Sequence, residues 1–322
     1  MALISGRPVK IAGTGVYIPE EIMTNADLEK FLDTNDEWIT TRTGIKQRHF
    51  AAAGETISDM AFKAALAALA DAGLSADDLD MVLAGSATPD TVCPPVSARV
   101  QGMLGANNAG ALDTHAACTS SLSGMSVAVA GIASGMWNSV LVIGVESFKN
   151  CLDWEDRATC ILFGDGAGAA VLSAAKEGEG RFISSRLLAD GSKSDYITIV
   201  SDSPEVKRVV RMKGNEVFKF VSKVMPGFLT EFCAESGLTP DNVDLWIMHQ
   251  ANTRINEGVL KKLGVSMDKT LINLENYGNT SAASMLITLN EAVKTGRLHK
   301  GGKAALVAFG SGMTLGAMLY EI

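Results

Sequence analysis

The chain repeats a short motif within itself, and this repeat limits the folds that are open to it. Residues 73–80 read Gly-Leu-Ser-Ala-Asp-Asp-Leu-Asp, and residues 237–244 read Gly-Leu-Thr-Pro-Asp-Asn-Val-Asp. Each copy follows an apolar pattern with helical spacing and precedes a short apolar run typical of a buried strand, at 81–84 and 245–248. The repeat therefore predicts two α/β halves of similar plan.

A second match occurs in the same order along the chain. Cys118-Thr-Ser-Ser corresponds to Asn279-Thr-Ser-Ala, and each segment begins a helix of small residues. These helices are expected to end at Gly135 and Gly296. Cys118 and Asn279 lie 161 positions apart, and so do Gly135 and Gly296. Because strand and helix patterns alternate, we expect mostly parallel sheets with helices on their faces. In this alignment Asn279 is the structural equivalent of Cys118, and the two side chains are expected to face one cavity.

Length and composition fit this arrangement and exclude several classes of function. The 322 residues divide into halves at 1–175 and 176–322, linked through residues 176–180. Hydrophobic residues make up 47%, aromatic residues only 6%, and there are 32 glycines, which suits helices packed closely on sheets. A net charge of −8 argues against nucleic-acid binding. The 5 cysteines form no CxxC pair, so we expect free thiols in a reducing cytosol and no metal site. We expect no membrane span and no secretory signal.

Cys118 lies where a strand pattern changes into a helix pattern. The residues from Ala109 to Asp113 are mostly small or apolar, and apolar residues with helical spacing follow the cysteine. A thiol at a helix N-terminus faces free backbone N–H groups and the positive end of the helix dipole, and both favour the nucleophilic thiolate. The position predicts an enzyme with a covalent acyl-thioester intermediate; the alternative is a small buried cysteine.

Two polar residues in the second half complete a candidate site. His249 follows the apolar run 245–248, at the carboxyl end of a strand, where sites in α/β proteins gather. Asn279 opens a small-residue helix, and its amide can donate hydrogen bonds to an oxyanion or enolate without adding charge. The structural alternatives are a strand-end histidine and a plain helix N-cap.

These segments together resemble β-ketoacyl-acyl-carrier-protein synthase III, the condensing enzyme that starts type II fatty acid synthesis. The resemblance extends almost end to end. It rests on the segments Ala116–Cys118, His249–Asn252 and Gly278–Ser284, supported by Thr24–Leu28, Asp36–Ile45, Phe163–Val171, Gly214–Phe218 and Gly310–Gly312. The family has the thiolase-like fold, an α/β fold with two duplicated halves in five αβαβα layers, and it is usually a homodimer.

The resemblance implies a Cys-His-Asn mechanism without a metal or redox cofactor. Cys118 would attack an acyl-CoA thioester, and malonyl on acyl carrier protein would enter once the cysteine is acylated. His249 and Asn279 would bind the malonyl thioester oxygen and stabilise the enolate formed when CO₂ leaves. The carbanion would then attack the acyl-cysteine to give a β-ketoacyl product. The backbone N–H groups of Cys118 and Ser311 are implied as the other oxyanion hole.

The resemblance also implies where the substrates bind. Trp38 and Arg157 would enclose the adenine of CoA, because an aromatic face and a guanidinium plane both stack on a base, and Arg42 would contact a CoA phosphate. The remaining positions form two sets, the pantetheine channel (Gly214, Phe218, Ala251 and Asn252) and a basic docking surface for the acidic carrier protein (Lys219, Arg254, Lys261 and Lys262). Without the resemblance, Trp38 would be a half-buried anchor, Arg42 and Arg157 would form surface ion pairs, and the basic docking residues would form a solvated helix face.

Three places depart from the family pattern. The nucleophile is followed by Thr119-Ser120-Ser121, as in elongating and polyketide synthases, although those enzymes use two histidines. His115 stands where a small or apolar residue is common. The loop 90–95 lacks the phenylalanine that caps the primer pocket in many members. The resemblance implies that Phe148 and Phe163 line that pocket.

Several other functions remain compatible with the residues. A relative on the same scaffold would pass the acyl group to another acceptor, as an ester-forming acyltransferase or a quinolone- or polyketide-type condensing enzyme does. A cysteine hydrolase would release the acyl group to water without malonyl, and a binding scaffold would have no activity. A thiolase is disfavoured because the segment 310–312 carries no second cysteine.

Overall fold

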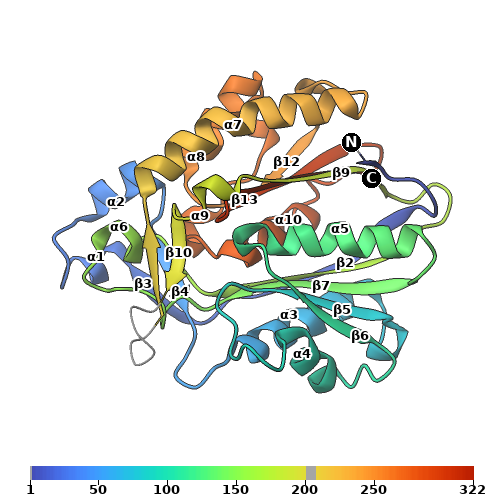
Figure 1. The fold of residues 1–322 in the computed structure, drawn as a ribbon, viewed down its shortest axis with the longest axis horizontal. Helices are drawn as coiled ribbons and strands as arrows, with labels where there is room; N and C mark the ends of the chain where they lie inside the picture. The colour runs from blue at the N-terminus through green and yellow to red at the C-terminus, as the bar shows by residue number, and fades with distance from the viewer. Residues whose placement is uncertain (1, 201–207) are drawn as a thin grey trace.

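The structure is a computed structural model that describes residues 2–200 and 208–322. It contains two five-stranded sheets, with helices between them and on both outer faces, which gives the five expected layers (Figure 1). The first sheet has the order β2-β8-β7-β5-β6. Its strands are β2 (Val9–Tyr17), β5 (Met81–Gly85), β6 (Gly110–Thr114), β7 (Ser139–Glu146) and β8 (Gly166–Ala174).

The second sheet repeats the plan of the first. Its order is β1-β9-β14-β13-β12, so β9, β14, β13 and β12 take the places of β2, β8, β7 and β5. The strands are β1 (Ala2–Leu3), β9 (Arg181–Ala189), β12 (Leu245–Met248), β13 (Lys303–Gly310) and β14 (Thr314–Glu321). The predicted duplication is thus present in the strand order.

The sheets are mixed, so the expectation of mostly parallel sheets was wrong. In the first sheet β8 runs antiparallel to β2 and β7, and in the second β14 runs antiparallel to β9 and β13. The parallel pairs are β5 with β6 and β7, and β12 with β13. Only residues 311–313 connect β13 to β14. A connection of this length cannot form the crossover that two neighbouring parallel strands need, so β14 runs antiparallel to β13.

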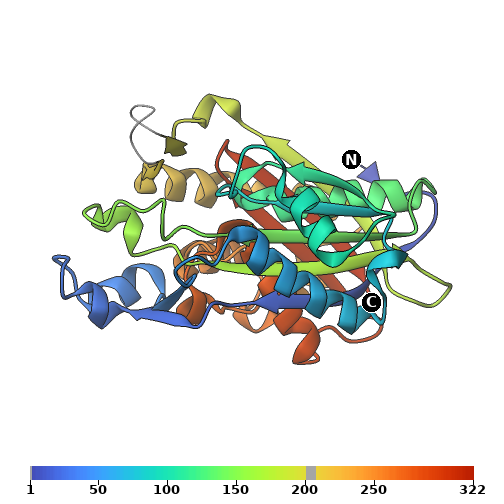
Figure 2. The same ribbon diagram turned by 90° about the horizontal axis from the view of Figure 1, so that it is seen from below.

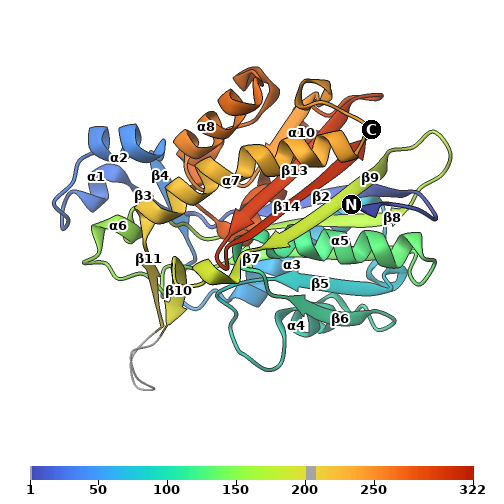
Figure 3. The same ribbon diagram turned by 45° about the horizontal axis from the view of Figure 1, so that its top comes forward.

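Helices form the other three layers. The central layer holds α5 and α10; α3 and α4 cover the outer face of the first sheet, and α7 and α8 cover that of the second (Figure 1, Figure 3). Their bounds are α3 (Ile57–Ala72), α4 (Val96–Leu104), α5 (Ser120–Ala133), α7 (Gly214–Glu235), α8 (Thr253–Leu263) and α10 (Ser284–Lys294). Within the described ranges, no helix is both long and apolar enough to cross a bilayer.

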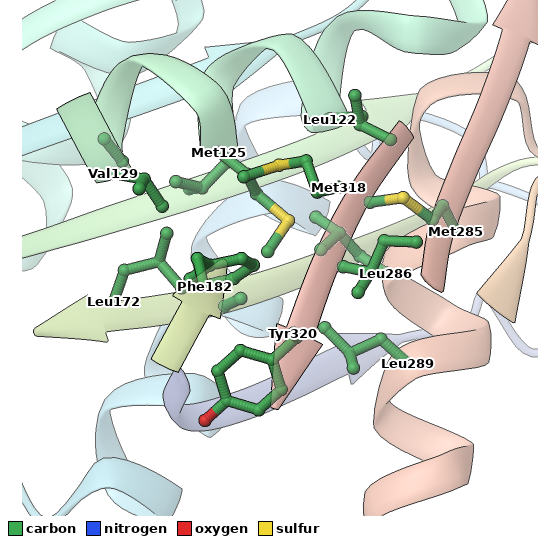
Figure 4. Packing of buried hydrophobic residues seen from close by; sticks show 14 of the residues in the cluster. Leu122, Met125, Val129, Leu172, Phe182, Met285, Leu286, Leu289, Met318 and Tyr320 are labelled. Atoms are coloured by element: carbon green, nitrogen blue, oxygen red, sulfur yellow. The ribbon is translucent and has the colours of Figure 1, made fainter. Parts of the chain in front are cut away.

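The core of the molecule lies around the central layer. Leu122 and Met125 of α5 and Met285 and Leu286 of α10 are completely buried, and they pack together with Met318 of β14 (Figure 4). Both sheets therefore bury apolar side chains against the same two helices. This burial explains why these helices carry so few charged residues.

Shorter elements gather at one end of the molecule, on the left in Figure 1 and Figure 2. They comprise two hairpins, β3 (Glu21–Thr24) with β4 (Gln47–Phe50) and β10 (Ile197–Val200) with β11 (Val209–Met212), and the helices α1 (Asn25–Leu28), α2 (Asp36–Thr43), α6 (Arg157–Cys160) and α9 (Leu274–Tyr277). The chain also forms the 3₁₀ turns η1 (Ala76–Asp78), η2 (Ala117–Thr119), η3 (Gly191–Lys193), η4 (Pro240–Asn242), η5 (Met267–Lys269) and η6 (Ser281–Ala283).

The structure corrects the alignment of the two halves at the nucleophile. Ala117 opens η2 and Ser281 opens η6; both have positive φ, 49° and 47°, and they lie 164 positions apart. The expected spacing of 161 fits only the helix ends, because α10 has 11 residues and α5 has 14. Cys118 therefore corresponds to Ala282, and Asn279 is not its structural equivalent.

Candidate active site

One cavity of about 910 Å³ receives all three predicted catalytic side chains. Cys118 enters it from η2 at the start of α5, His249 from the end of β12, and Asn279 from the segment ahead of η6. The cysteine belongs to the first half and the other two residues belong to the second. The cavity is thus lined by side chains from both predicted halves of the chain.

The chain turns sharply just ahead of the nucleophile. Ala117 has the left-handed φ of 49°, which is uncommon for a residue with a side chain. Gly310, the last residue of β13, lies directly against the turn. A Cβ at this glycine would lie 2.8 Å from the backbone nitrogen of Cys118 and 2.9 Å from its Cβ. The glycine therefore lets the second half approach the nucleophile closely.

The thiol of Cys118 is less acidic than its position at a helix start suggested. Burial raises its pKa to about 11, and the nearby Glu146 carboxylate adds to the rise. The Ser281 hydroxyl, 3.2 Å from the sulfur, and the backbone N–H groups of Cys118 and Ser311 lower this pKa, but by less than burial raises it. The thiol is consequently protonated at neutral pH, so its attack on a thioester needs a proton acceptor.

His249 is a neutral imidazole in the wall of the cavity. The residue is 1% exposed, and burial lowers its pKa to about 3. Its Nδ1 is hydrogen-bonded to Ser284 Oγ, and the ring packs edge-on against Phe309 with 5.1 Å between centroids. A neutral imidazole can still donate one hydrogen bond, which suits the stabilisation of an oxyanion.

Asn279 is held so that its amide nitrogen is left for the cavity. Its backbone N–H donates to Leu162 O over 2.8 Å, and its Oδ1 accepts a hydrogen bond from the Ser281 N–H over 2.8 Å. The bond to Oδ1 fixes the amide, and its Nδ2 hydrogens are the donors that remain. A ligand oxygen in the cavity is the partner that this geometry suits.

Sequence reasoning missed two polar residues behind the nucleophile. Ser281 Oγ lies 3.2 Å from Cys118 Sγ and 3.0 Å from Glu146 Oε1. Glu146 is completely buried, and burial raises its pKa to about 7. One signal was available in the sequence, because this glutamate is an acid at the end of a strand, Ser139–Glu146, that is otherwise almost wholly apolar.

The predicted adenine-binding residues lie together at the outer end of the site. The guanidinium carbon of Arg157 lies 4.8 Å from the Trp38 ring centroid, and that of Arg42 lies 5.6 Å from it. Trp38 and Arg42 line the cavity. Arg157 does not line it; its guanidinium donates to the backbone oxygen of Asp33.

The four residues predicted for the pantetheine channel line the same cavity, namely Gly214, Phe218, Ala251 and Asn252. Asn252 also caps α8, because its Oδ1 accepts from the N–H of Arg254 over 2.9 Å. Its Nδ2 donates to Arg42 O over 3.1 Å. The asparagine side chain thereby joins the start of α8 to the last turn of α2.

The predicted primer-pocket residues form an aromatic pair. Phe148 and Phe163 are 3% and 4% exposed, their centroids lie 4.5 Å apart, and both line the cavity. His115 lines the cavity too. Thr119 and Ser120, which depart from the family pattern, brace the turn at the nucleophile through hydrogen bonds to the backbone of Ala116.

The predicted docking residues are exposed on α7 and α8, which pack against each other (Figure 3). Arg254 also lines the cavity, and its guanidinium carbon lies 5.8 Å from the Phe218 ring centroid. Lys219 is paired with Glu216 over 2.9 Å. Lys261 and Lys262 occupy the last turn of α8. In the described part of the chain, no cluster of three or more His, Cys, Asp or Glu side chains is placed to hold a metal.

Two family descriptions match the chain. Residues 112–191 match 3-oxoacyl-[acyl-carrier-protein] synthase III, and residues 233–322 match the C-terminal part of the same family. A β-ketoacyl-[acyl-carrier-protein] synthase III from Caldanaerobacter subterraneus is 45% identical over 94% of this chain and 95% of its own length. One from Symbiobacterium thermophilum is 42% identical over 97% of both chains.

Solved structures agree with these sequence matches. A 3-oxoacyl-[acyl-carrier-protein] synthase III from Aquifex aeolicus superposes with a TM-score of 0.93 at 42% identity, over 98% of this chain and all of that one. The priming β-ketosynthase of the R1128 polyketide pathway gives a TM-score of 0.93 at 31% identity, over all of this chain and 98% of its own. The chain therefore has the thiolase-like fold that the sequence predicted.

Proposed function

The chain belongs to the β-ketoacyl-[acyl-carrier-protein] synthase III family, and we propose that Cys118, His249 and Asn279 carry out the family's decarboxylative condensation. The enzyme is an acyltransferase that joins an acyl-CoA primer to malonyl-acyl carrier protein and so initiates type II fatty acid synthesis. One observation carries the assignment of the residues: a thiol, a neutral imidazole and an amide from both halves converge on one cavity.

In the first half-reaction, Cys118 Sγ attacks the thioester carbonyl of acyl-CoA. The backbone N–H groups of Cys118 and Ser311 stabilise the oxyanion of the tetrahedral intermediate, because both already lie close enough to the sulfur to lower its pKa. CoA then leaves, and the acyl chain lies on the cysteine. Phe148 and Phe163 line the pocket that receives this chain.

In the second half-reaction, malonyl-acyl carrier protein occupies the channel that CoA left. His249 and Asn279 donate hydrogen bonds to the malonyl thioester oxygen, where negative charge develops as CO₂ departs. Both groups are neutral and held from behind, so they do not need to reorganise during the reaction. The carbanion attacks the acyl carbon, and the product leaves as β-ketoacyl-acyl carrier protein.

The two carriers use the outer end of the same cavity. Trp38, Arg42 and Arg157 bind the adenine and phosphate end of CoA: Trp38 and Arg157 enclose the adenine, and Arg42 contacts a phosphate. Gly214, Phe218, Ala251 and Asn252 line the pantetheine arm. The acidic carrier protein docks on Lys219, Arg254, Lys261 and Lys262, which are exposed on α7 and α8; Arg254 also lines the cavity.

The proposal extends to assembly and compartment. β6 pairs with β5 alone in the described sheet, and Leu112 on it is 48% exposed, so this edge strand suits pairing with a second copy in a homodimer. Sedimentation analysis distinguishes a dimer from a monomer. In the part of the chain that the structure describes, the 5 cysteines form no disulfide, which suits the reducing cytoplasm.

Intact-mass spectrometry with a panel of acyl-CoA thioesters tests the proposed chemistry. We expect the protein to gain one acyl mass, to keep it in water, and to lose it with CO₂ release when malonyl-acyl carrier protein is added. The Cys118→Ser variant is expected to gain none. Release of the acyl group to water alone would indicate a hydrolase, and a loaded enzyme that ignores malonyl-acyl carrier protein would indicate another acceptor.

A further inference from the structure

A buried polar chain connects the nucleophile with a carboxyl group that the mechanism above does not use. The hydroxyl of Ser281 lies between the two, 3.2 Å from Cys118 Sγ and 3.0 Å from Glu146 Oε1. A hydroxyl has one hydrogen, so it can donate to one of these atoms while accepting from the other. The thiol and the carboxyl are therefore linked through a single shared oxygen.

The surroundings of Glu146 are polar but uncharged. Its carboxyl accepts hydrogen bonds from the Ala87 N–H (3.0 Å), Thr88 Oγ1 (2.7 Å) and Ser86 Oγ (3.3 Å), besides the one from Ser281. Across residues 2–200 and 208–322 no ion pair includes this glutamate. A completely buried carboxyl without a cation is costly to ionise, and such groups concentrate at functional sites.

We propose that Glu146 is a positioning residue that receives the Cys118 proton through the Ser281 hydroxyl while the thiol attacks acyl-CoA. The inference deepens the proposed acyl transfer and rests on it. The S–H bond breaks as its proton joins Ser281 Oγ, and the proton already on that oxygen passes to Glu146 Oε1. The freed sulfur electron pair forms the bond to the acyl carbon. The departing CoA sulfur takes one proton, so the carboxylate is regenerated and free CoA thiol leaves.

The electrostatics favour Glu146 over His249 as the acceptor. Burial raises the pKa of Glu146 to about 7, whereas burial lowers the pKa of His249 to about 3. Near neutral pH the carboxyl thus takes up a proton far more readily than the imidazole. Proton transfer also removes the negative charge that raises the pKa of Cys118, so the transfer itself favours the thiolate.

The relay predicts a particular pH dependence of acylation. Glu146 must be ionised to accept a proton, so the rate should rise as the pH passes through about 7. The other titratable groups to be distinguished from Glu146 are Cys118, His115 and His249, which line the cavity, and Asp165, which accepts the hydroxyl of Ser147, the residue next to Glu146, over 2.9 Å. Glu146→Gln should abolish this rise. His115→Gln, and Asp165→Asn as a matched buried carboxyl, should retain it.

Two measurements on the full-length protein separate a relay from a merely structural role. The acylation rate with acyl-CoA should fall about 10²-fold in Glu146→Gln and in Ser281→Ala, with no further loss in the double variant. Alkylation of Cys118 by iodoacetamide reports the thiolate directly. Because the carboxylate raises the thiol pKa, Glu146→Gln should shift the alkylation midpoint to lower pH and speed alkylation at neutral pH.

The outcomes also separate this inference from the proposed function. If both single variants load acyl groups at the wild-type rate, or if acylation and alkylation fall together in Glu146→Gln, the relay is overturned. A wild-type enzyme that never loads an acyl group would instead overturn the proposed function. Ser281→Ala keeps the inference testable if Glu146→Gln fails to fold.

Discussion

At the scale of single residues, the hydroxyl of Ser284 decides which His249 nitrogen can meet a substrate. Ser284 Oγ contacts His249 Nδ1, lies 3.0 Å from Ser281 O and accepts the Gln250 N–H over 3.3 Å. Its single hydrogen can go to Ser281 O or to Nδ1. Only in the second case does Nε2 carry a hydrogen and donate to the malonyl thioester oxygen.

Removing this hydroxyl should impair one half-reaction and spare the other. In Ser284→Ala nothing fixes the tautomer of His249, so we expect malonyl decarboxylation to fall about tenfold or more while acylation by acyl-CoA is unchanged. Thr288→Val is the control, because the Thr288 hydroxyl bonds Ser284 O one turn further along α10. Stopped-flow measurement of each half-reaction checks this, and an equal loss in both would contradict it.

The amide of Asn279 should be needed for decarboxylation in the same way. Asn279→Ala removes the Nδ2 donors, and loss of one oxyanion donor costs about 10²–10³ in rate. Asn279→Asp keeps an acceptor for the Ser281 N–H but has no such donors, so it should be equally slow. Acylated enzyme is mixed with malonyl-acyl carrier protein and CO₂ is counted. If Asn279→Asp released CO₂ at the wild-type rate, the contribution of Asn279 to decarboxylation would come from the hydrogen bond that its Oδ1 accepts from the Ser281 N–H, and not from the Nδ2 donors.

The residues of the site differed in how far the sequence revealed them. Cys118 and His249 could be found because each follows an apolar strand pattern, whereas Asn279 was found through the family resemblance and through an alignment with Cys118 that the structure corrects. Ser281 touches Glu146 across 135 positions of sequence, and no local pattern encodes such a contact. The acidity of Cys118 was misjudged because the helix start is visible in the sequence while the burial that outweighs it is not.

At the scale of elements, the repeated motif proved reliable because both copies form the same local structure. Gly73 and Gly237 follow α3 and α7 with φ of 64° and 75°, a conformation that glycine adopts without strain. Two residues later, Ser75 and Thr239 cap η1 and η4 with reciprocal hydrogen bonds. Strand direction was misjudged because an antiparallel strand and a parallel one, both fully buried, have the same apolar composition.

The close approach of β13 to η2 makes Gly310 a test of how rigidly this junction is held. In Gly310→Ala the new methyl group would lie 2.8 Å from the Cys118 backbone nitrogen, so η2 or β13 must shift. We expect acylation to fall about 10²-fold, since small displacements of a nucleophile are costly, and stability to fall by about 1–3 kcal/mol.

A control for this effect lies in α7. A Cβ at Gly227 would meet no atom within 4 Å, so Gly227→Ala should stabilise the helix by roughly 0.5–1 kcal/mol and leave acylation unchanged. Denaturant unfolding and acylation rates check both variants. If Gly310→Ala were acylated at the wild-type rate, the contact between β13 and η2 would be able to accommodate the added methyl group without displacing Cys118.

At the scale of the whole molecule, duplication places the site at the junction of the halves. We propose to divide the chain at 1–175 and 176–322, since the first sheet ends at Ala174 and the second begins at Arg181. β1 departs from this division, because it joins the second sheet by pairing with β9. Because the two halves have the same fold and pack against each other, Cys118 of the first half lies in one cavity with the hydrogen-bond donors His249 and Asn279 of the second half.

The distribution of charge over the whole molecule gives the last prediction. The net charge is −8, so an acidic carrier protein is repelled except where cations are concentrated, as on α8, which carries Arg254, Lys261 and Lys262 against one acidic residue, Glu257. Lys261→Glu should raise the KM for malonyl-acyl carrier protein about tenfold and make it less sensitive to salt, because a screened attraction has been removed. Acylation by acyl-CoA should not change.

Lys300→Glu makes the same change of charge just ahead of Lys303, where β13 begins, and β13 reaches the site only at its other end. It should therefore leave the KM at the wild-type value. Steady-state kinetics at two salt concentrations distinguish local attraction from net charge. Equal effects of the two substitutions would mean that total charge, and not the surface of α7 and α8, governs the encounter with the carrier protein.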